Sequence, residues 1–264
     1  MRVLVTVKFT PDLQSHRSFT AGTVTRIGDD GSMNELDENA VEAALQVVEA
    51  HGEGEVIALT VGGADAVAAV RKALQLGATQ AFHVSDDAIA GSDVFGTAAV
   101  LAAAIRAIDS EQKLDLVVTG MAALDGLTSM LPTALAAHLD WPQLTLASAL
   151  EVDGAIRTAT IRRDLHDAHE TVSAPLPAVV SVTDEANKPR YPNFKLIMAA
   201  RSIPVTTWSL ADLGIEASAV GASAARTRVL DASPRPPREN RQVVTDTGNG
   251  GTALAAFLIE RGLA

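Results

Sequence analysis

The stretch VVTGMAALDGLTSM, residues 117–130, decides the fold. A short apolar strand runs into a turn of small residues with one acid, Asp125, and a helix is expected from about Thr128 to Leu139. In doubly wound α/β proteins, a turn at this place commonly holds a phosphate group. Neither the GxGxxG fingerprint nor the lysine of a Walker loop is present. The sequence therefore raises the question of what this turn holds.

The alternation of strand and helix extends through the first half of the chain. Strands are predicted at residues 2–8, 55–61, 81–84 and 114–120, and helices at 34–52, 64–76, 92–108 and 128–139. In the helix over 34–52, Asn34 is expected as the N-cap, with Asp37 in the capping-box position and Gly52 after the end. Strands and helices that alternate at this spacing predict parallel βαβ units and a sheet covered on both faces.

After Pro142 the pattern changes. Residues 145–164 alternate about the turn at Asp153–Gly154 and predict an antiparallel hairpin. The chain then predicts a buried strand, a polar loop, a helix of two turns, a short strand and a last helix, at residues 177–182, 184–196, 196–201, 204–208 and 252–261. The predicted fold is thus α/β: a doubly wound, mostly parallel, Rossmann-like sheet with an added antiparallel hairpin and an extended C-terminal arm. We expect a domain over 1–220, which includes loop 184–196, and an arm over 221–264.

Composition excludes several classes of protein. The 264 residues are 47% hydrophobic and 20% charged, which allows a sizeable core. The absence of cysteine excludes disulfides, thiol nucleophiles and cysteine metal sites. A net charge of −11 argues against binding to nucleic acid or to an anionic membrane. No run of eighteen uncharged apolar residues is present, and the start, MRVLVTVKF, is unlike a cleaved signal. A cytoplasmic location without membrane insertion is expected.

Three strand ends are candidates for a ligand site: Val7–Lys8, Val61–Gly63 and Gly120–Ser129. Small residues there would let a flat ring or a phosphate approach the backbone. The N-terminus of the helix expected from Thr128 would offer free N–H groups to an anion. Glycine-rich turns also occur merely because the chain turns tightly, and Lys8 could simply leave the sheet edge, so the residues alone leave both interpretations open.

No catalytic or metal site can be assembled from the sequence. A run of acids could suggest a cation site, but carboxylates are also favoured at a helix start: Asp29, Asp30, Glu35, Asp37 and Glu38. His166 and His169 fall in a strand-loop segment, where the i, i+3 spacing of a helix does not apply. The candidate serines, Ser92, Ser129 and Ser148, stand in no GxSxG elbow. A nucleotide-holding fold without catalytic side chains indicates a carrier rather than an enzyme.

Five segments, in order along the chain, resemble the beta subunit of electron transfer flavoprotein. They are VTVKFTPD (5–12), SMNELDENAVEAAL (32–45), VRKALQLGA (70–78), TGMAALDGLTSMLPTALAAHLDWPQ (119–143) and LPAVVSVTDEANKPRYPNFKLIMAARSIPV (176–205). The last contains the most specific signature, an Asn-x-Pro-Arg-Tyr loop between a strand and a helix. Five ordered matches over most of the chain identify it as a member of this family.

This resemblance implies a heterodimer with an alpha subunit that holds the redox-active FAD. The beta subunit of the family buries an adenine nucleotide, usually AMP, which has no redox role. The carrier takes electrons from flavin-dependent dehydrogenases, such as the acyl-CoA dehydrogenases of fatty acid oxidation, and passes them to a quinone-reducing acceptor of the respiratory chain. Some relatives bind a second FAD in place of AMP and bifurcate electrons, and the sequence leaves that alternative open.

Carried over from the family, the nucleotide contacts lie at the strand ends and at the helix cap. They are Thr6, Asn34, Glu35, Leu36, Asp37, Val61, Gly120, Met121, Ala122, Ala123, Leu124, Asp125, Gly126, Leu127, Thr128, Ser129, Met130 and Leu131. The phosphate is expected near Thr128, Ser129 and Met130. Many relatives carry Lys or Arg and then Gln at positions 121 and 122, and often Gln and then Thr or Val at 130 and 131. Side-chain donors are fewer here, so backbone N–H groups would do more of the binding.

Loop 184–196 resembles the family's recognition loop, which docks on dehydrogenases through an apolar anchor. Phe194 occupies the anchor position, and Pro189 and Tyr191 would stiffen the loop. An exposed Phe is sensible as an interface anchor, but it could instead pack inward as the first core residue of the following helix. Asp164 falls where relatives have a glutamate implicated in contact with the mobile FAD domain.

Two other classes share a similar α/β core. A nucleotide sensor resembling the universal stress family would need neither the Asn-x-Pro-Arg-Tyr loop nor a long C-terminal arm. An adenylating enzyme of the PP-loop kind would carry an SGGxDS-like loop after the first strand, whereas this chain has FTPDLQS at residues 9–15. The electron carrier subunit is therefore the preferred interpretation.

Overall fold

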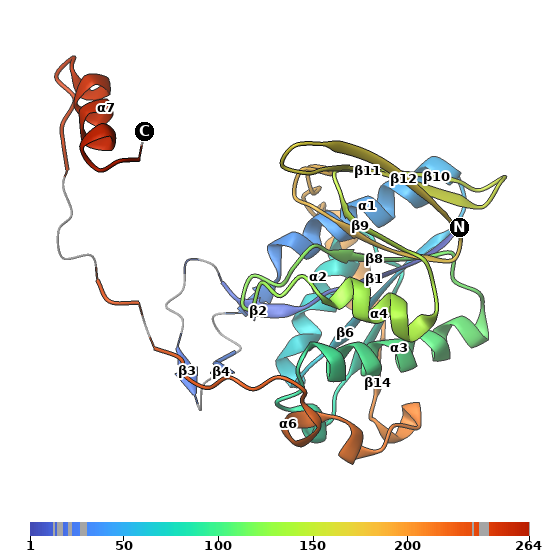
Figure 1. The fold of residues 1–264 in the computed structure, drawn as a ribbon. Helices are drawn as coiled ribbons and strands as arrows, with labels where there is room; N and C mark the ends of the chain where they lie inside the picture. Colours follow the sequence, from blue (N-terminus) through green and yellow to red (C-terminus); the bar gives the residue numbers. More distant parts are fainter. Residues whose placement is uncertain are drawn as a thin grey trace. The chain divides into compact units, whose positions relative to one another are not determined.

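The computed structural model describes residues 1–12, 14, 18–20, 23–26, 31–233, 235–237 and 243–263. The chain forms two compact units, Met1–Leu230 and Asp231–Ala264, and each is described here by itself. The first unit contains the parallel sheet and every element that surrounds the candidate site (Figure 1).

A seven-stranded sheet runs through the first unit in the order β14-β7-β6-β1-β8-β13-β9, and all its neighbouring strands are parallel. The strands are β1 (Arg2–Thr6), β6 (Glu55–Val61), β7 (Gln80–Val84), β8 (Leu116–Gly120), β9 (Gln143–Ala147), β13 (Ala178–Val182) and β14 (Val205–Trp208). The expected α/β fold with a mostly parallel sheet is confirmed. The sequence placed the end of the first strand at residue 8, whereas β1 ends at Thr6 and the chain re-enters a short strand at Phe9.

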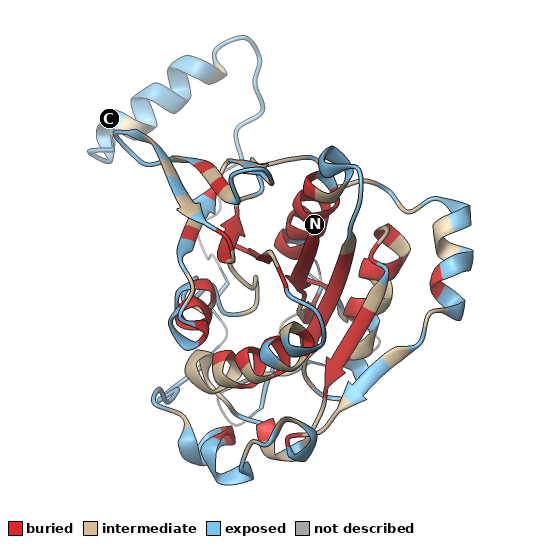
Figure 2. Ribbon diagram, turned by 90° about the vertical axis from the view of Figure 1, so that its right-hand side faces the viewer, coloured by how far each residue is buried: buried red, intermediate tan, exposed pale blue. Residues whose placement is uncertain are grey.

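Helices cover both faces of the sheet, as the continuous apolar strands require. On one face lie α1 (Glu35–His51) and α2 (Val67–Leu76), which pack with Val3, Val5 and Ala58. On the other lie α3 (Val94–Glu111) and α4 (Leu131–Leu139), which pack with Leu4, Ile57 and Leu59. Alternate side chains of one strand thus enter different cores, and the central strands are buried from end to end (Figure 2).

The antiparallel hairpin expected over 145–164 is part of a larger element. β10 (Ala149–Asp153) pairs with β11 (Thr158–Asp164), and β11 pairs in turn with β12 (His169–Pro175). The result is a separate three-stranded sheet, which packs Leu150, Val152 and Val172 against the core on the α1 side of the main sheet. The hairpin prediction is confirmed for residues 149–164 and is wrong for 145–147, which belong to β9 of the parallel sheet. The third strand is an addition that the sequence pattern did not indicate.

The remaining elements of the first unit are short. They are β2 (Phe9–Pro11), β3 (Phe19–Thr20), β4 (Thr23–Val24), β5 (Gly31–Met33), α5 (Phe194–Ser202), α6 (Gly221–Ala224) and the 3-10 helices η2 (Ala64–Ala66), η3 (Asp87–Ile89), η4 (Ala211–Leu213) and η5 (Ala217–Ala219). β2 pairs with β5 and β3 with β4, both antiparallel. The glycines expected to break the β segments near residue 20, Gly22 and Gly28, lie outside the described residues.

The helix expected from Thr128 begins three residues later, at Leu131. Leu127 and Ser129 have φ of 50° and 51°, which is the left-handed region that a right-handed helix cannot contain. Pro132 fits the first turn of α4, where a backbone N–H is not needed. The segment before Leu131 is therefore a strained loop and not a helix turn.

The C-terminal part contributes to both units. Within the first, Gly221 N–H donates to Ser92 Oγ at 2.8 Å, and the N–H groups of Arg226 and Thr227 donate to Asp93 Oδ2 at 2.8 and 2.9 Å. Within the second, α7 (Gly250–Glu260) is the one helix of the described residues. In the part of the chain that the structure describes, no helix is both long and apolar enough to cross a membrane.

Candidate nucleotide site

A cavity of about 650 Å³ lies at the carboxyl ends of the central strands. From β1 the chain builds the sheet in one direction through β6 and β7, then returns to the other side of β1 at β8. Strand order therefore reverses at β1, and the crevice outside such a switch point is where open α/β sheets bind ligands. The segments after β1, β6, β7 and β8 line the cavity.

Asn34 joins the start of α1 to the loop after β8. Its Nδ2 donates to Ala122 O at 2.9 Å, and its Oδ1 accepts from Leu124 N–H at 3.0 Å. Its backbone N–H donates to Lys8 O at 2.8 Å. Asn34 is the N-cap residue of α1, as expected, but its side chain makes no cap hydrogen bond, so the expected capping box is wrong. The amide instead fixes the path of the loop over 120–131.

Asp37 holds the end of β1 from the same turn of α1. Its Oδ2 accepts from Lys8 N–H at 2.8 Å, and the residue is buried. Burial raises the pKa of this carboxyl to about 7, against hydrogen bonds from Asn34 and from the N–H groups of Lys8 and Gly120 that favour the ionised form. Asp37 therefore holds backbone segments that border the cavity and does not cap the helix.

The Asp125 carboxylate, in the loop over 120–131, pairs with two cationic side chains. Lys8 Nζ lies 2.7 Å from its Oδ1, and Arg26 Nε donates to its Oδ2 at 2.6 Å. Burial would raise the pKa of Asp125, but the charges and hydrogen bonds of Lys8 and Arg26 outweigh it and hold that pKa below its usual range. The carboxylate is ionised and fully enclosed, whereas both cations keep part of their surface free.

The wall on the far side of the cavity comes from the segment before α3. Asp93 caps this helix, because its Oδ1 accepts from Phe95 N–H and Gly96 N–H, each at 3.0 Å. Its Oδ2 accepts from the chain at Arg226 and Thr227, as described above. The sequence analysis missed this wall, although Gly91-Ser92-Asp93 before a helix of small residues was a visible signal for it.

Most of the expected nucleotide contacts line the cavity. They are Thr6, Asp37, Val61, Gly120, Met121, Ala122, Ala123, Asp125, Gly126, Leu127, Thr128, Ser129 and Leu131. Five do not: Asn34, Glu35, Leu36, Leu124 and Met130. Of these, Asn34 does not reach the cavity itself but positions the loop over 120–131, which lines it. The cavity is also lined by residues that were not among the nucleotide contacts implied by the family resemblance. They include Lys8, Phe9, Arg26, Gly62–Ala66 and the segment from Ser85 to Val94.

The polar clusters considered from the sequence have other roles. Among the described residues, no group of three or more histidine, aspartate or glutamate side chains is placed to hold a metal ion. Asp29 and Asp30 lie outside the described residues. His169 contacts Asp164 through Nδ1, and Arg162 Nη2 donates to the same carboxylate at 3.1 Å, so this cluster is an exposed contact within the small sheet.

The polar loop expected over 184–196 ends at Asn193, because α5 begins at Phe194, two residues before the expected helix start. The loop over 184–193 is bonded to α1. Arg190 Nε donates to Glu42 Oε2 at 2.7 Å, and its Nη1 donates to Glu49 Oε1 at 2.6 Å. Asn187 Nδ2 donates to Asn39 O at 3.0 Å. Because α1 also carries Asn34 at its start, a single helix supports both this loop and the loop over 120–131.

Two aromatic side chains stand out from this support. Tyr191 is 95% exposed, and Phe194, the first residue of α5, is 78% exposed. The turn between them is fixed by Asn193, whose Oδ1 accepts from Leu196 N–H at 2.9 Å as the N-cap of α5. The alternative interpretation, in which Phe194 is a core residue, is therefore wrong, whereas its role in docking stays a prediction.

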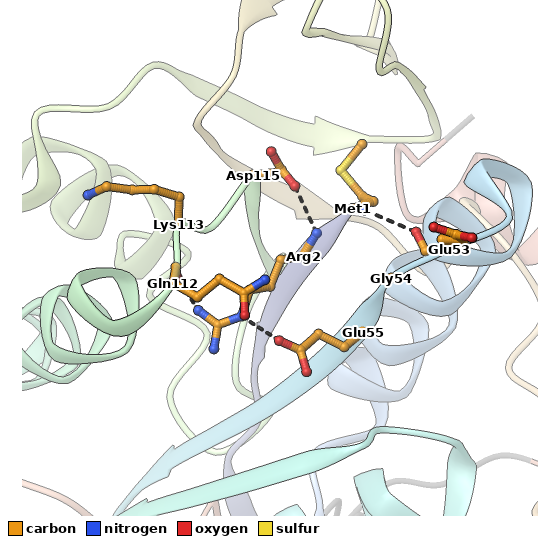
Figure 3. Close-up of a pocket in the computed structure, with 8 residues that line it drawn as sticks. All are labelled: Met1, Arg2, Glu53, Gly54, Glu55, Gln112, Lys113 and Asp115. Atoms are coloured by element: carbon orange, nitrogen blue, oxygen red, sulfur yellow. Dashed lines mark hydrogen bonds and ion pairs between the residues drawn. The ribbon is translucent and has the colours of Figure 1, made fainter.

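A second, shallower hollow of about 430 Å³ lies at the opposite, amino end of β1 (Figure 3). Several of its charged groups already have partners: Arg2 N–H donates to Asp115 Oδ2 at 2.8 Å, the Arg2 guanidinium pairs with Glu55, and the Met1 amino group donates to the backbone oxygen of Glu53 at 3.0 Å. These pairs close the amino edge of the sheet and leave the cavity at the carboxyl edge as the candidate site.

The comparisons with known proteins agree with this geometry. The family described as electron transfer flavoprotein domain matches residues 21–213. The electron transfer flavoprotein subunit beta of Mycobacterium leprae (strain TN) is 38% identical over 97% of each chain, and so is that of Mycobacterium tuberculosis (strain ATCC 25618 / H37Rv). The chain belongs to the electron transfer flavoprotein beta-subunit family. Membership in this family of electron carriers sets aside the nucleotide-sensor and adenylating-enzyme alternatives.

A more distant relative carries a different name. The caffeyl-CoA reductase-Etf complex subunit CarD of Acetobacterium woodii is 33% identical over 94% of this chain and 93% of its own. The relatives of this chain thus include one named for a reductase-Etf complex as well as ones named for electron transfer flavoprotein alone.

Proposed function

We propose that this chain is the beta subunit of a heterodimeric electron transfer flavoprotein and that its cavity holds a structural AMP. The observation that carries the proposal is the cavity at the switch point of the sheet, walled by the segments that resemble the family's nucleotide contacts. In this role the chain supports the FAD of an alpha subunit and supplies no catalytic side chain of its own.

The chemistry of the cavity suits a nucleotide that is bound without undergoing a reaction. Its walls combine apolar and small residues, such as Val61 and Gly120, with backbone of the loop over 120–131, which suits a flat base and a ribose. Among the described lining residues the carboxylates of Asp37, Asp93 and Asp125 are already engaged by backbone N–H groups or by cations. A ligand bound here would therefore stabilise the fold and would not be chemically changed.

The exposed pair Tyr191 and Phe194 forms the proposed docking surface for partner dehydrogenases. The Arg190 ion pairs hold the loop beneath it to α1, and Pro189 restricts the loop backbone, which lowers the entropy lost when a partner binds. Flavin-dependent dehydrogenases docked here, acyl-CoA dehydrogenases among them, would pass electrons to the FAD of the alpha subunit for delivery to a quinone-reducing acceptor.

The second unit is proposed to dock on the alpha subunit. Its helix α7 leaves Leu254, Phe257 and Ile259 exposed and buries none of its residues. Such an apolar helix gains order by burying its side chains on a partner. The arm expected from the sequence spans 221–264. Residues 221–227 bond to Ser92 and Asp93, so we propose that the docking part is the second unit, 231–264.

A second candidate is a beta subunit that binds FAD in place of AMP, as in electron-bifurcating flavoproteins. Two observations favour it. The cavity extends past the expected AMP contacts to the segment from Ser85 to Val94, and one relative is named as a subunit of a reductase-Etf complex. The larger ligand would use the same switch-point crevice.

Co-expression with the neighbouring alpha-subunit gene tests the assembly. A tag on this chain should retain the alpha subunit with a flavin spectrum, and a partner dehydrogenase should reduce that flavin. A tagged chain that recovers no flavin-bearing partner, although both proteins are soluble, would contradict the proposed function.

A further inference from the structure

We propose that Lys8 and Arg26 are the phosphate-recognising cations of the cavity, and that they make the site favour a nucleotide over a nucleoside. This inference rests on the proposed nucleotide site and adds to it the groups that select the ligand. The structure brings together two cations on one carboxylate: Lys8 from the end of β1, Arg26 from the segment after β4, and Asp125 from the loop after β8.

The arrangement leaves positive charge free for a ligand. The Asp125 side chain is 0% exposed, whereas those of Lys8 and Arg26 are each 41% exposed. One buried carboxylate neutralises one of the two cations, so one positive charge of the trio is left uncompensated when Lys8 is protonated. Burial lowers the pKa of Lys8, against the attraction of Asp125. Lys8 and Arg26 have more N–H donors than the carboxylate uses, and all three residues line the cavity.

Backbone hydrogen bonds hold two members of this trio, Lys8 and Asp125, in place before any ligand binds. The Lys8 backbone is fixed on both sides of its Cα, because its N–H donates to Asp37 and its carbonyl accepts from Asn34. Asp125 lies in the loop that Asn34 positions through Ala122 and Leu124. Preorganised donors of this kind bind an anion without paying the cost of ordering long side chains at that moment.

The charge of the other lining residues gives the ligand an orientation. Among the described residues that line the cavity, Lys8 and Arg26 are the cations. Asp37 and Asp125 lie beside them and accept hydrogen bonds from Lys8 or Arg26, whereas Asp65, Asp86, Asp87 and Asp93 supply acids without a lining cation on the side of β6 and β7. β7 is two strands from β1, or about 10 Å at the usual spacing. An anionic group is therefore repelled from the β7 side and attracted to the Lys8 and Arg26 side.

The loop over 120–131 carries no cationic side chain, so positive charge for a phosphate must come from other segments. Its Met121 and Ala122 side chains carry no hydrogen-bond donor, and Thr128 and Ser129 offer only neutral hydroxyls. Arginine and lysine form charge-assisted hydrogen bonds to phosphate that are about twice as strong as neutral ones. Thr128 and Ser129 line the same cavity and would complete the phosphate contacts.

The test compares ligands that differ only in the phosphate. The full-length chain, purified with its alpha subunit and freed of nucleotide, is titrated with AMP and with adenosine by calorimetry. Lys8→Met and Arg26→Gln should each weaken AMP binding on the order of 10- to 100-fold, the range for a charged hydrogen bond. Adenosine affinity should stay at the wild-type value, and Lys8→Arg should restore most of the AMP affinity.

Lys72→Met is the matched control, because Lys72 pairs with Glu38, is 39% exposed and does not line the cavity. AMP affinity that matches this control in both variants would overturn the inference and leave the nucleotide site standing. Equal losses for AMP and adenosine, at unchanged melting temperature, would also overturn it. If Lys8→Met fails to fold, Arg26→Gln carries the test from a separate segment. A wild-type complex that binds neither ligand contradicts the proposed function itself.

Discussion

Gly120 packs directly against Asp37, so that a Cβ built on Gly120 would lie 2.5 Å from Oδ1 of Asp37 and 2.8 Å from Leu36 O. Gly120→Ala should force apart the end of β8 and the first turn of α1. Overpacking of this kind costs about 1–3 kcal/mol in free energy of unfolding. Because α1 and β8 both border the cavity, the variant should also retain less nucleotide after purification.

Gly126→Ala is the matched control for this substitution. Gly126 lies in the same loop, but a Cβ there would meet no atom within 4 Å. Urea unfolding of both variants measures the difference directly. Equal stability of Gly120→Ala and Gly126→Ala would show that the contact with Asp37 does not constrain the site.

Asp37 should make the stability of the chain depend on pH. Its pKa is raised by burial from 3.8 to about 7, so between these values the folded chain binds a proton that the unfolded chain has released. The free energy of unfolding should therefore fall as the pH rises from about 4 to about 7 and level off above. At about 1.4 kcal/mol per unit of pKa shift, the total is up to about 4 kcal/mol.

Asp37→Asn removes this titration. The difference in free energy of unfolding between wild type and Asp37→Asn, measured in urea from pH 4.5 to 8, should change steadily in favour of the variant as the pH rises. Parallel curves over that range would mean that Asp37 titrates at its ordinary value.

Phe194→Ala tests the docking surface. Removing a central aromatic anchor typically costs on the order of 2–4 kcal/mol of binding, or roughly 30- to 800-fold in affinity. The apparent Michaelis constant of a partner dehydrogenase for this carrier should rise accordingly. Melting temperature should stay near wild type, because Phe194 is exposed in the chain itself. Ile156→Ala, at an exposed site between β10 and β11, is the control. A large fall in melting temperature with unchanged kinetics would contradict the anchor role.

Arg190→Met should weaken the same docking step without touching the aromatic side chains. The substitution removes the ion pairs to Glu42 and Glu49 that hold the loop on α1, so the loop must be ordered when the partner binds. At about 0.5–1.5 kcal/mol per immobilised side chain, the Michaelis constant should rise roughly 2- to 10-fold. Arg157→Met, which breaks the exposed pair with Asp115, should leave it unchanged. An Arg190→Met carrier with wild-type kinetics would show that the loop needs no such support.

The regular elements near the site followed from the sequence because their causes are local. Apolar runs separated by glycine and helix caps predicted β1, β6, β8 and the helix after residue 34. The strand ends picked out from the same pattern, at Val7, Val61 and Gly120, all reach the cavity. Strand order in a parallel sheet then forces these ends together.

The parts that the sequence analysis missed depend on contacts between distant segments. Asn34 and Asp37 have the spacing of a capping box, yet in the fold their polar atoms find better partners at Ala122 and Lys8. The left-handed residues Leu127 and Ser129 delay α4, which no local rule predicts for leucine and serine. The pairing of Lys8 and Arg26 with Asp125 likewise spans 117 and 99 positions of the chain, so sequence spacing gave no sign of it.

The central claim is that the switch-point cavity holds a structural AMP in a heterodimer with one redox-active FAD. The most direct measurement is to denature the purified heterodimer and count the released nucleotides by chromatography against protein concentration. The account predicts one FAD and one AMP per heterodimer; two FAD and no AMP would transfer the site to the bifurcating alternative. One FAD with no further adenine nucleotide would contradict the assignment of the cavity.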